Sequence, residues 1–333
     1  MRPFDYARAT SVCDALELAA ARPGAVFVAG GTDLVPLWKD AVCAPPAVID
    51  ISRLPLGAVE VGDREIAIGA LARMADVADH PGIGAAAPAI AEALRASASG
   101  QLRNAATIGG NLVQRTRCSY FRTAGFSCNK RAPGSGCGAL GGDDRRHAIF
   151  GASEHCAATH ASDLAVALVA LDATVDLVGR GGAGDAGGDR AVAVGELFVT
   201  PGDRPDRETV LRPGELIRAL RVPRTALARR SCYLKVRDRA SFDFAVVSVA
   251  AALHIEAGVV RDARLAAGGV GTVPWRLRGS EQALAGARPG EPAFAEAAAR
   301  ATDGARPLGH NGFKLELLRR CVRRVLDELA GAA

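Results

Sequence analysis

The sequence predicts an α+β protein of two or three domains. Its 333 residues exceed the roughly 100–200 residues that are typical of one domain. Residues 1–50 alternate strand-like and helix-like segments, as a small βαβ-like unit does. Beyond residue 230, strand-like runs come first and helix-like runs follow, which is the order expected when helices pack on one face of a sheet.

The opening unit begins with a helix predicted over residues 10–22. Thr10 is a suitable N-cap for it, and the apolar residues recur at helical spacing. A short β run follows at residues 25–28 and ends in a glycine turn. A helical pattern restarts at Leu34, and residues 47–51 form the next predicted strand.

The middle of the chain mixes strands and helices around a long irregular stretch. Its strands are expected at residues 59–61, 65–68, 174–178, 192–194 and 215–222. One Ala-rich helix is expected near residues 84–98, and a second begins at Ser162 and Asp163. Residues 179–188 are typical of a low-complexity hairpin tip. Periodicity disappears from 114 to 159, and so long a loop inside a compact chain is usually functional or disordered.

The C-terminal third predicts strands first and helices afterwards. The strands are expected at residues 231–236, 246–256 and 264–271. The helices are expected at residues 276–285, 292–302 and 313–330. We therefore place a domain boundary close to Pro223, with one domain over residues 1–224 and the other over 225–333.

Charge and hydropathy exclude several classes of protein. The net charge of +5 is mild and the basic runs are short, so nucleic-acid binding is not expected. No apolar run approaches the ~20 residues that cross a bilayer, so membrane insertion is not expected. The first residues lack the apolar segment of a secretory signal. We expect a cytoplasmic protein, which reaches the periplasm only if a Tat-exported partner carries it.

Two glycine turns are candidates for holding a phosphate-containing ligand. The first comprises Val28, Ala29, Gly30, Gly31, Thr32, Asp33 and Leu34, and the second comprises Thr107, Ile108, Gly109, Gly110 and Asn111. Paired glycines let the backbone approach a ligand closely, and the N–H groups that follow form an anion site. Two such turns suit the two phosphates of a dinucleotide, although each alone also reads as a tight turn. Neither turn is G-x-G-x-x-G, so a Rossmann site is not predicted.

Half of the eight cysteines are crowded into the irregular stretch. They are Cys118, Cys128, Cys137 and Cys156. An even spread would place only about one cysteine in this window. A disulfide framework is not expected without a secretory signal, so the four thiols predict a metal centre. The other four cysteines are scattered in apolar patterns and read as buried thiols.

The residues alone leave the kind of metal centre open. Four thiolates suit a [4Fe–4S] cluster, a [2Fe–2S] cluster or a structural zinc ion. Zinc sites usually contain a short C-x2–4-C knuckle, and its absence counts against zinc. His147, His155 and His160 are the natural co-ligands if the ion is zinc. Basic neighbours would offset the negative charge of a cluster; they are Arg115, Arg117, Arg122, Lys130, Arg131, Arg145 and Arg146.

The sequence displays no substrate chemistry of its own. It contains no H-E-x-x-H, no G-x-S-x-G and no carboxylate pair at a telling spacing. We therefore name no catalytic residue in this chain. This pattern favours a redox relay over a self-contained hydrolase.

Four motifs together resemble the FAD-binding medium subunits of the xanthine dehydrogenase and carbon monoxide dehydrogenase family of molybdenum hydroxylases. They are Ala-Gly-Gly-Thr-Asp-Leu at 29–34, Ala-Thr-Ile-Gly-Gly-Asn at 106–111, Ser-Asp-Leu at 162–164 and Tyr-Leu-Lys-Val-Arg at 233–237. The resemblance spans nearly the whole chain, in order as well as spacing. It implies a PCMH-type FAD-binding domain with subdomains at about 1–55 and 56–224. It also implies a C-terminal α+β domain like that of the CO dehydrogenase flavoproteins.

The irregular stretch, which we call the insert (residues 114–159), narrows the resemblance. Its segments Arg-Thr-Arg-Cys at 115–118, Cys-Asn-Lys-Arg at 128–131, Pro-Gly-Ser-Gly-Cys at 133–137 and His-Ala-Ile-Phe-Gly at 147–151 carry it. They resemble the FAD and [4Fe–4S] subunit of bacterial heterotrimeric periplasmic aldehyde oxidoreductases. 4-Hydroxybenzoyl-CoA reductase is a more distant relative that also carries an extra cluster. The resemblance implies a [4Fe–4S] cluster on the four cysteines of the insert.

The resemblance also implies roles for single residues. Residues 30–34 and 107–111 would hold the FAD pyrophosphate. Asp163 would bond the ribose or adenine side, and Lys235 would lie near the flavin ring. Lys235 also reads as an exposed strand residue, because it lies in a shorter motif.

The implied complex oxidises an aldehyde to a carboxylate. A large partner subunit carries the molybdenum cofactor, and a small partner subunit carries [2Fe–2S] clusters that pass electrons to FAD on this chain. An external acceptor then receives them. Two alternatives stay open: a xanthine or N-heterocycle dehydrogenase of the same family, and a zinc-stapled binding module without redox activity.

Overall fold

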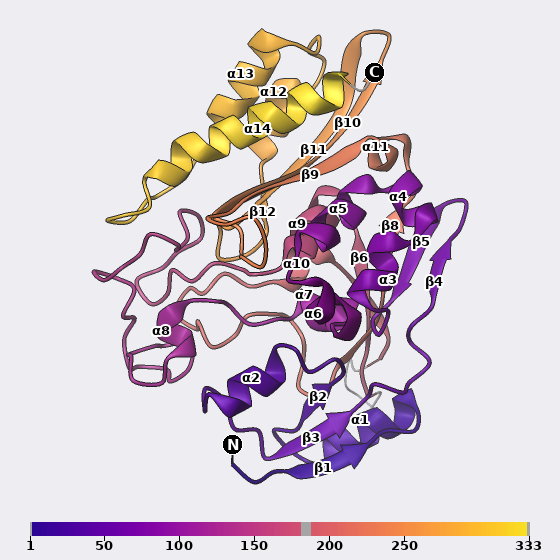
Figure 1. Cartoon of the computed structure of the whole chain (residues 1–333), viewed down its shortest axis with the longest axis vertical. Helices are drawn as coiled ribbons and strands as arrows, with labels where there is room; N and C mark the ends of the chain where they lie inside the picture. Colours follow the sequence, from indigo (N-terminus) through magenta and orange to yellow (C-terminus); the bar gives the residue numbers. More distant parts are fainter. Residues whose placement is uncertain (1, 181–187, 332–333) are drawn as a thin grey trace.

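The chain forms three β-sheets that follow one another in sequence. The computed structural model describes residues 2–180 and 188–331. Figure 1 shows the N-terminal sheet at one end, the central sheet with its helices in the middle, and the C-terminal sheet with a long helix at the opposite end. This combination confirms the predicted α+β class. Most of the hairpin tip predicted at 179–188 lies outside the described residues.

The N-terminal sheet holds three parallel strands in the order β1-β3-β2. Its elements are β1 (Asp5–Arg8), α1 (Val12–Ala21), β2 (Val26–Val28), α2 (Leu34–Lys39) and β3 (Ala47–Asp50). The N-cap of α1 is Ser11 rather than the predicted Thr10, because Ser11 Oγ accepts the Asp14 N–H at 3.0 Å. Strand β1 is missing from the sequence prediction, since its mostly exposed residues show no apolar alternation.

The central sheet has five antiparallel strands in the order β4-β5-β8-β6-β7. These strands are β4 (Val59–Val61), β5 (Glu65–Gly69), β6 (Thr174–Val178), β7 (Arg190–Ala193) and β8 (Leu216–Pro223). The helices around it are α3 (Met74–Asp79), α4 (Pro81–Ala86), α5 (Pro88–Ala96), α6 (Gly100–Ala105), α7 (Ile108–Leu112), α9 (Asp163–Ala170), α10 (Val194–Leu197) and α11 (Ala226–Arg229). The buried faces of α5 and α9 belong to the main hydrophobic core.

The single Ala-rich helix predicted near residues 84–98 is two helices. Helix α4 ends at Ala86 and α5 begins at Pro88. Ala87 between them has φ −154° and ψ 71°, outside the helical region. The break follows from Pro88, because a proline lacks the N–H that would continue the helix and disfavours helical geometry in the residue before it.

The insert runs along one side of the molecule with little regular structure (Figure 1). Its helix is the short α8 (Ser119–Arg122), and isolated bridges pair Cys128 with Cys137 and Ser153 with Cys156. Its C-terminal end is anchored to the third sheet. The Phe150 N–H donates to the Val270 carbonyl at 3.0 Å, and the Phe150 ring stacks on Trp275 at 5.0 Å.

The C-terminal sheet has four antiparallel strands in the order β12-β11-β10-β9. Its elements are β9 (Ser231–Val236), β10 (Val247–Glu256), β11 (Val259–Gly268), β12 (Trp275–Arg276), α12 (Arg278–Leu284), α13 (Glu291–Arg300) and α14 (Phe313–Gly331). The three helices lie together on one face of the sheet (Figure 1). Strand β11 begins earlier than predicted, because Ala257 and Gly258 take positive φ angles and close a tight hairpin. Among the described residues, no helix is long and apolar enough to cross a membrane.

Candidate functional site

A cavity of about 800 Å³ opens between the N-terminal sheet and the helices of the central part; we call it the large cavity. Both glycine turns border it. The predicted site residues in its lining are Val28, Ala29, Gly30, Gly31, Thr32, Asp33, Leu34, Thr107, Gly110, Asn111 and Asp163. Its volume lies within the range of about 300–1,000 Å³ that ligand and cofactor sites occupy.

The first glycine turn packs against the segment that leads into the second one. Gly30 lies against the carbonyl of Ala105, and an added Cβ would overlap that oxygen. Glycine is therefore required here by the approach of two backbone segments, and Gly31 beside it has a φ of +69°. Ile108 and Gly109 are buried behind the lining, where the Gly109 N–H donates to the Ala70 carbonyl at 2.8 Å.

The carboxylate of Asp33 bonds the insert. Its Oδ2 accepts the Arg115 N–H at 2.8 Å, and its Oδ1 lies 2.9 Å from Arg117 and 2.7 Å from Arg122. Asp33 is an expected cofactor ligand, but three groups of the insert already bond its side chain. Its position therefore indicates a second task, which is to fix the insert against the first glycine turn.

Asp163 is the first residue of α9 and lies in a buried polar cluster at the edge of the large cavity. It accepts hydrogen bonds from Tyr233 Oη at 2.5 Å, Ser97 Oγ at 2.9 Å and Lys235 Nζ at 2.8 Å. Burial, with the Asp163 carboxylate beside it, raises the pKa of Tyr233 well above its usual value, so the phenol stays a donor. The cluster ties α9 to strand β9 of the C-terminal sheet.

Lys235 is neither exposed nor in the lining of the large cavity. Its side chain is 3% exposed, and its ammonium bonds Asp163 and the Ala96 carbonyl, the latter at 3.1 Å. A lysine buried this deeply needs a counter-charge, which Asp163 provides. The structure thus places Lys235 against Asp163, where it holds that carboxylate, and its expected position near the flavin ring stays a prediction.

Sequence reasoning missed the C-terminal side of the large cavity. Phe242, Asp243 and Phe244 line it from the loop between β9 and β10. The Arg117 guanidinium lies 4.8 Å from the Phe244 ring centroid. Burial lowers the pKa of Arg117 to about 10 in spite of Asp33, so the side chain stays charged at neutral pH. The sequence did offer one signal for this side of the cavity, because Phe242 and Phe244 are two aromatic residues close together in a predicted loop.

The four cysteines of the insert line one small cavity, which we call the cysteine cavity. Cys118 precedes α8, Cys128 faces Cys137 across an isolated bridge, and Cys156 comes from the end of the insert. Cys118 Sγ lies 3.2 Å from His147 Nε2, and Cys156 Sγ accepts the Ala158 N–H at 3.4 Å. Burial raises the pKa of Cys118 to about 11, so a bound positive centre would be needed to hold it as a thiolate.

The three candidate zinc co-ligands do not gather at the cysteine cavity. His155 lines it, and His147 contacts Cys118, but His160 lies in a separate cavity with its ring against Phe198. Across residues 2–180 and 188–331, no group of three or more His, Cys, Asp or Glu side chains is arranged to hold one metal ion.

Two family profiles cover almost the whole chain. Residues 2–225 match the FAD binding domain in molybdopterin dehydrogenase, and residues 232–329 match the CO dehydrogenase flavoprotein C-terminal domain. The chain is a FAD-binding medium subunit of the molybdenum hydroxylase family. The large cavity lies in the part matched by the FAD-binding profile, apart from the 242–244 loop that closes one side.

Relatives in this family match the chain from end to end. The aldehyde oxidoreductase FAD-binding subunit PaoB of Escherichia coli is 42% identical over 100% of both chains. The glyceraldehyde dehydrogenase medium chain of Sulfolobus acidocaldarius is 26% identical over 98% of both chains. A quinoline 2-oxidoreductase structure from Pseudomonas putida 86 covers 100% of this chain and 98% of its own, at 22% identity and a TM-score of 0.75. A Cu,Mo-CO dehydrogenase structure covers 100% of both chains at 22% identity, with a TM-score of 0.76.

Family membership excludes one of the alternatives that the sequence left open. Members are oxidoreductase subunits, so a zinc-stapled binding module without redox activity is wrong for this chain. The two structural neighbours are only 22% identical to this chain, so they show its fold alone. Several relatives are named as medium chains or as subunits of complexes.

Proposed function

We propose that this chain is the electron-transfer subunit of a molybdenum-dependent aldehyde oxidoreductase. It holds FAD in the large cavity and a [4Fe–4S] cluster in the cysteine cavity. Electrons reach it from [2Fe–2S] clusters on a small partner subunit and leave to an external acceptor. The observation that carries the cluster is that four cysteines spread over the insert line one cavity.

The large cavity suits FAD in size and in the chemistry of its walls. Both glycine turns border it, and its lining includes the polar residues Thr32, Thr107 and Asn111. Arg115 and Arg117 also line it and would balance the pyrophosphate charge. Bound FAD would supply the exchange between one-electron and two-electron transfer. The protein holds the cofactor and keeps its phosphates next to fixed positive charge.

The cysteine cavity offers the ligand type that an iron–sulfur cluster needs. Its lining contains all four thiols of the insert. Thiolates are the usual ligands of [4Fe–4S] clusters, and a bound cluster would supply one-electron transfer. Lys130 lines the cavity and places one positive charge beside the four sulfurs. The insert thus offers ligands together with partial charge compensation.

The aldehyde substrate is supported by the relative PaoB, whose name states aldehyde oxidoreductase and which aligns along the full chain at 42% identity. The alternative is a hydroxylase of N-heterocycles. A nicotinate dehydrogenase FAD-subunit of Eubacterium barkeri matches 78% of this chain at 27% identity. Assaying the assembled complex with benzaldehyde, xanthine and nicotinate separates these substrates, and turnover of xanthine or nicotinate alone would overturn the aldehyde assignment.

The cofactors are tested by spectroscopy and metal analysis of the chain purified with its partner subunits under anaerobic conditions. Flavin absorbance, about four irons per chain beyond those of the [2Fe–2S] partner, and no zinc are expected. Cys137→Ser should remove the cluster signal in electron paramagnetic resonance while flavin remains. Cys13→Ser, at an exposed cysteine of α1, is the matched control and should change neither. A zinc ion in place of iron, or a cluster signal unchanged in the Cys137 variant, would contradict the proposal.

A further inference from the structure

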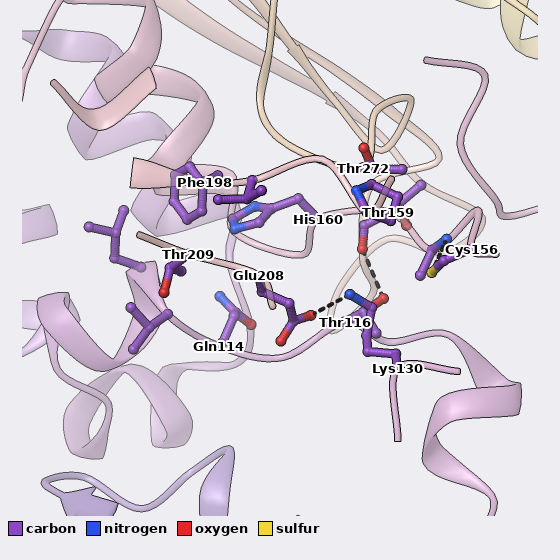
Figure 2. A pocket seen from close by; sticks show the side chains of 15 residues that line it. Gln114, Thr116, Lys130, Cys156, Thr159, His160, Phe198, Glu208, Thr209 and Thr272 are labelled. Atoms are coloured by element: carbon purple, nitrogen blue, oxygen red, sulfur yellow. Dashed lines mark hydrogen bonds and ion pairs between the residues drawn. The ribbon is translucent and has the colours of Figure 1, made fainter. Parts of the chain in front are cut away.

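A third cavity, of about 50 Å³, lies between the large cavity and the cysteine cavity; we call it the bridging cavity. It shares Val113 and Gln114 with the large cavity. It shares Lys130, Cys156 and Ala158 with the cysteine cavity. Figure 2 shows Lys130 and Cys156 on one side of it, with Glu208 between Lys130 and Gln114. The residues of the bridging cavity therefore contact the surroundings of both proposed cofactors.

Glu208 is fixed in this cavity by the segment that carries it. The Glu208 carbonyl accepts the Val199 N–H at 3.0 Å, and Thr209 pairs with Phe198 in an isolated bridge. Its carboxylate is ion-paired with Lys130 at 3.0 Å and with Arg115. Figure 2 draws the Lys130 contact as a dashed line. One carboxylate thus balances two cations of the insert.

Lys130 is held firmly at the wall of the cysteine cavity. Its side chain is 9% exposed, and its ammonium also donates to the Pro205 carbonyl at 2.8 Å. Both partners of the ammonium, Pro205 and Glu208, come from the same segment. Of the residues that line the cysteine cavity in the described chain, Lys130 is the one Lys, Arg, Asp or Glu. Its ammonium is therefore the permanent charge in the wall of that cavity.

Arg115 connects the same carboxylate to the large cavity. Its side chain pairs with Glu208, and its backbone N–H donates to Asp33 in the first glycine turn at 2.8 Å. A charge in a poorly hydrated place acts over several ångströms, because the surrounding protein screens it less than water does. An ammonium beside a cluster stabilises the added electron, and a carboxylate beside the ammonium reduces that effect.

We propose that the Lys130–Glu208 pair sets the reduction potential of the cluster held by Cys118, Cys128, Cys137 and Cys156. Lys130 raises this potential and Glu208 limits the rise. Both are positioning residues, because neither is a ligand. The inference rests on the proposed function, since it requires the cluster.

The test is a redox titration of the assembled complex, followed by electron paramagnetic resonance of the cluster. Lys130→Met should shift its midpoint to more negative values, whereas Glu208→Gln should shift it to more positive values. Lys130→Arg keeps the charge and should stay near the wild type. The double variant should lie between the two single ones. Glu296→Gln, which breaks the exposed pair of Glu296 with Arg300, is the control and should shift nothing.

The outcomes distinguish this inference from the proposed function. A wild-type complex without cluster iron would refute the cluster, and this inference with it. A wild-type cluster whose midpoint is unmoved in both variants, or moves in the same direction in both, would overturn the charge pair alone. Should Glu208→Gln lose iron, the comparison of Lys130→Met with Lys130→Arg still decides, because these two differ in charge. Should Lys130→Met lose iron, the shift in Glu208→Gln decides.

Discussion

The guanidinium of Arg122 donates a hydrogen bond of 2.7 Å to Asp33, across 89 residues of chain. The same arginine donates through Nε to the Thr116 carbonyl at 2.9 Å and so closes the loop around α8. Arg122 and Asp33 are each 17% exposed in their side chains, so the pair is largely shielded from water. The contact joins the insert to the first glycine turn, which means that order in the insert and the shape of the large cavity depend on each other.

Arg122→Met is expected to loosen flavin binding although Arg122 does not line the large cavity. A hydrogen bond to a charged group contributes about 1.5–3 kcal/mol to the free energy of unfolding. Loss of the Arg122–Asp33 bond should therefore destabilise the contact between the insert and the first glycine turn by about 2 kcal/mol. Arg117 still pairs with Asp33, which keeps the loss at this level. The flavin-to-protein ratio after gel filtration measures the effect. Arg320→Met, at an exposed pair with Glu316, is the control, and equal flavin loss in both variants would contradict the link.

Gly30→Ala should lower flavin content by pushing the first glycine turn away from Ala105, just before the second turn. The new methyl group would overlap the Ala105 carbonyl, so one of the two backbone segments must move. Overpacking of this kind lowers the free energy of unfolding by about 1–3 kcal/mol. Gly84→Ala is the matched control, because a Cβ there meets nothing within 4 Å. Flavin fluorescence released on denaturation gives the bound amount. A Gly30 variant with full flavin would show that the close contact with Ala105 is not needed for binding.

Asp163→Asn should destabilise the protein strongly by leaving the buried Lys235 ammonium without a counter-charge. Breaking one side of a buried ion pair costs about 3–5 kcal/mol. The double variant with Lys235→Met removes both charges and should regain part of the loss. Urea unfolding followed by circular dichroism measures all three proteins. If the double variant were no more stable than Asp163→Asn, the unpaired ammonium would not be the cause.

Stability should rise with pH above neutrality because of Lys314 on α14. Burial lowers the pKa of Lys314 from 10.5 to about 7, while its amine donates to the His147 and Gly269 carbonyls at 2.8 and 2.7 Å. Between these two pKa values the unfolded chain binds one more proton than the folded chain, so the free energy of unfolding increases with pH. The slope approaches about 1.4 kcal/mol per pH unit.

Lys314→Met isolates this contribution, since it removes the titrating amine and leaves the other groups in place. Urea unfolding at about pH 6, 8 and 9.5 should show the stability of the wild type rising relative to the variant over the whole series. A constant difference between the two proteins would mean that Lys314 keeps its ordinary pKa in the folded state.

Local patterns in the sequence determined much of the fold. Strand β9 begins and ends at the predicted residues. Helix α14 begins at the predicted residue, and its last described residue is one beyond the predicted end. Such elements are encoded by the spacing of their own apolar residues. The two glycine turns and the crowding of four cysteines are equally local, because each depends on residue type and on short distances along the chain.

Tertiary structure alone decided what the charged residues do. Lys235 and Asp163 are 72 residues apart, and nothing in either neighbourhood predicts that they form a buried pair. The same holds for Glu208, which meets Lys130 and Arg115 only because the insert folds against the segment carrying it. Apolar periodicity specifies which face of an element is buried, but the partner of a charge depends on how distant segments pack. That is why the sequence predicted the turns and the thiols, whereas only the folded chain shows the ion pairs that join them.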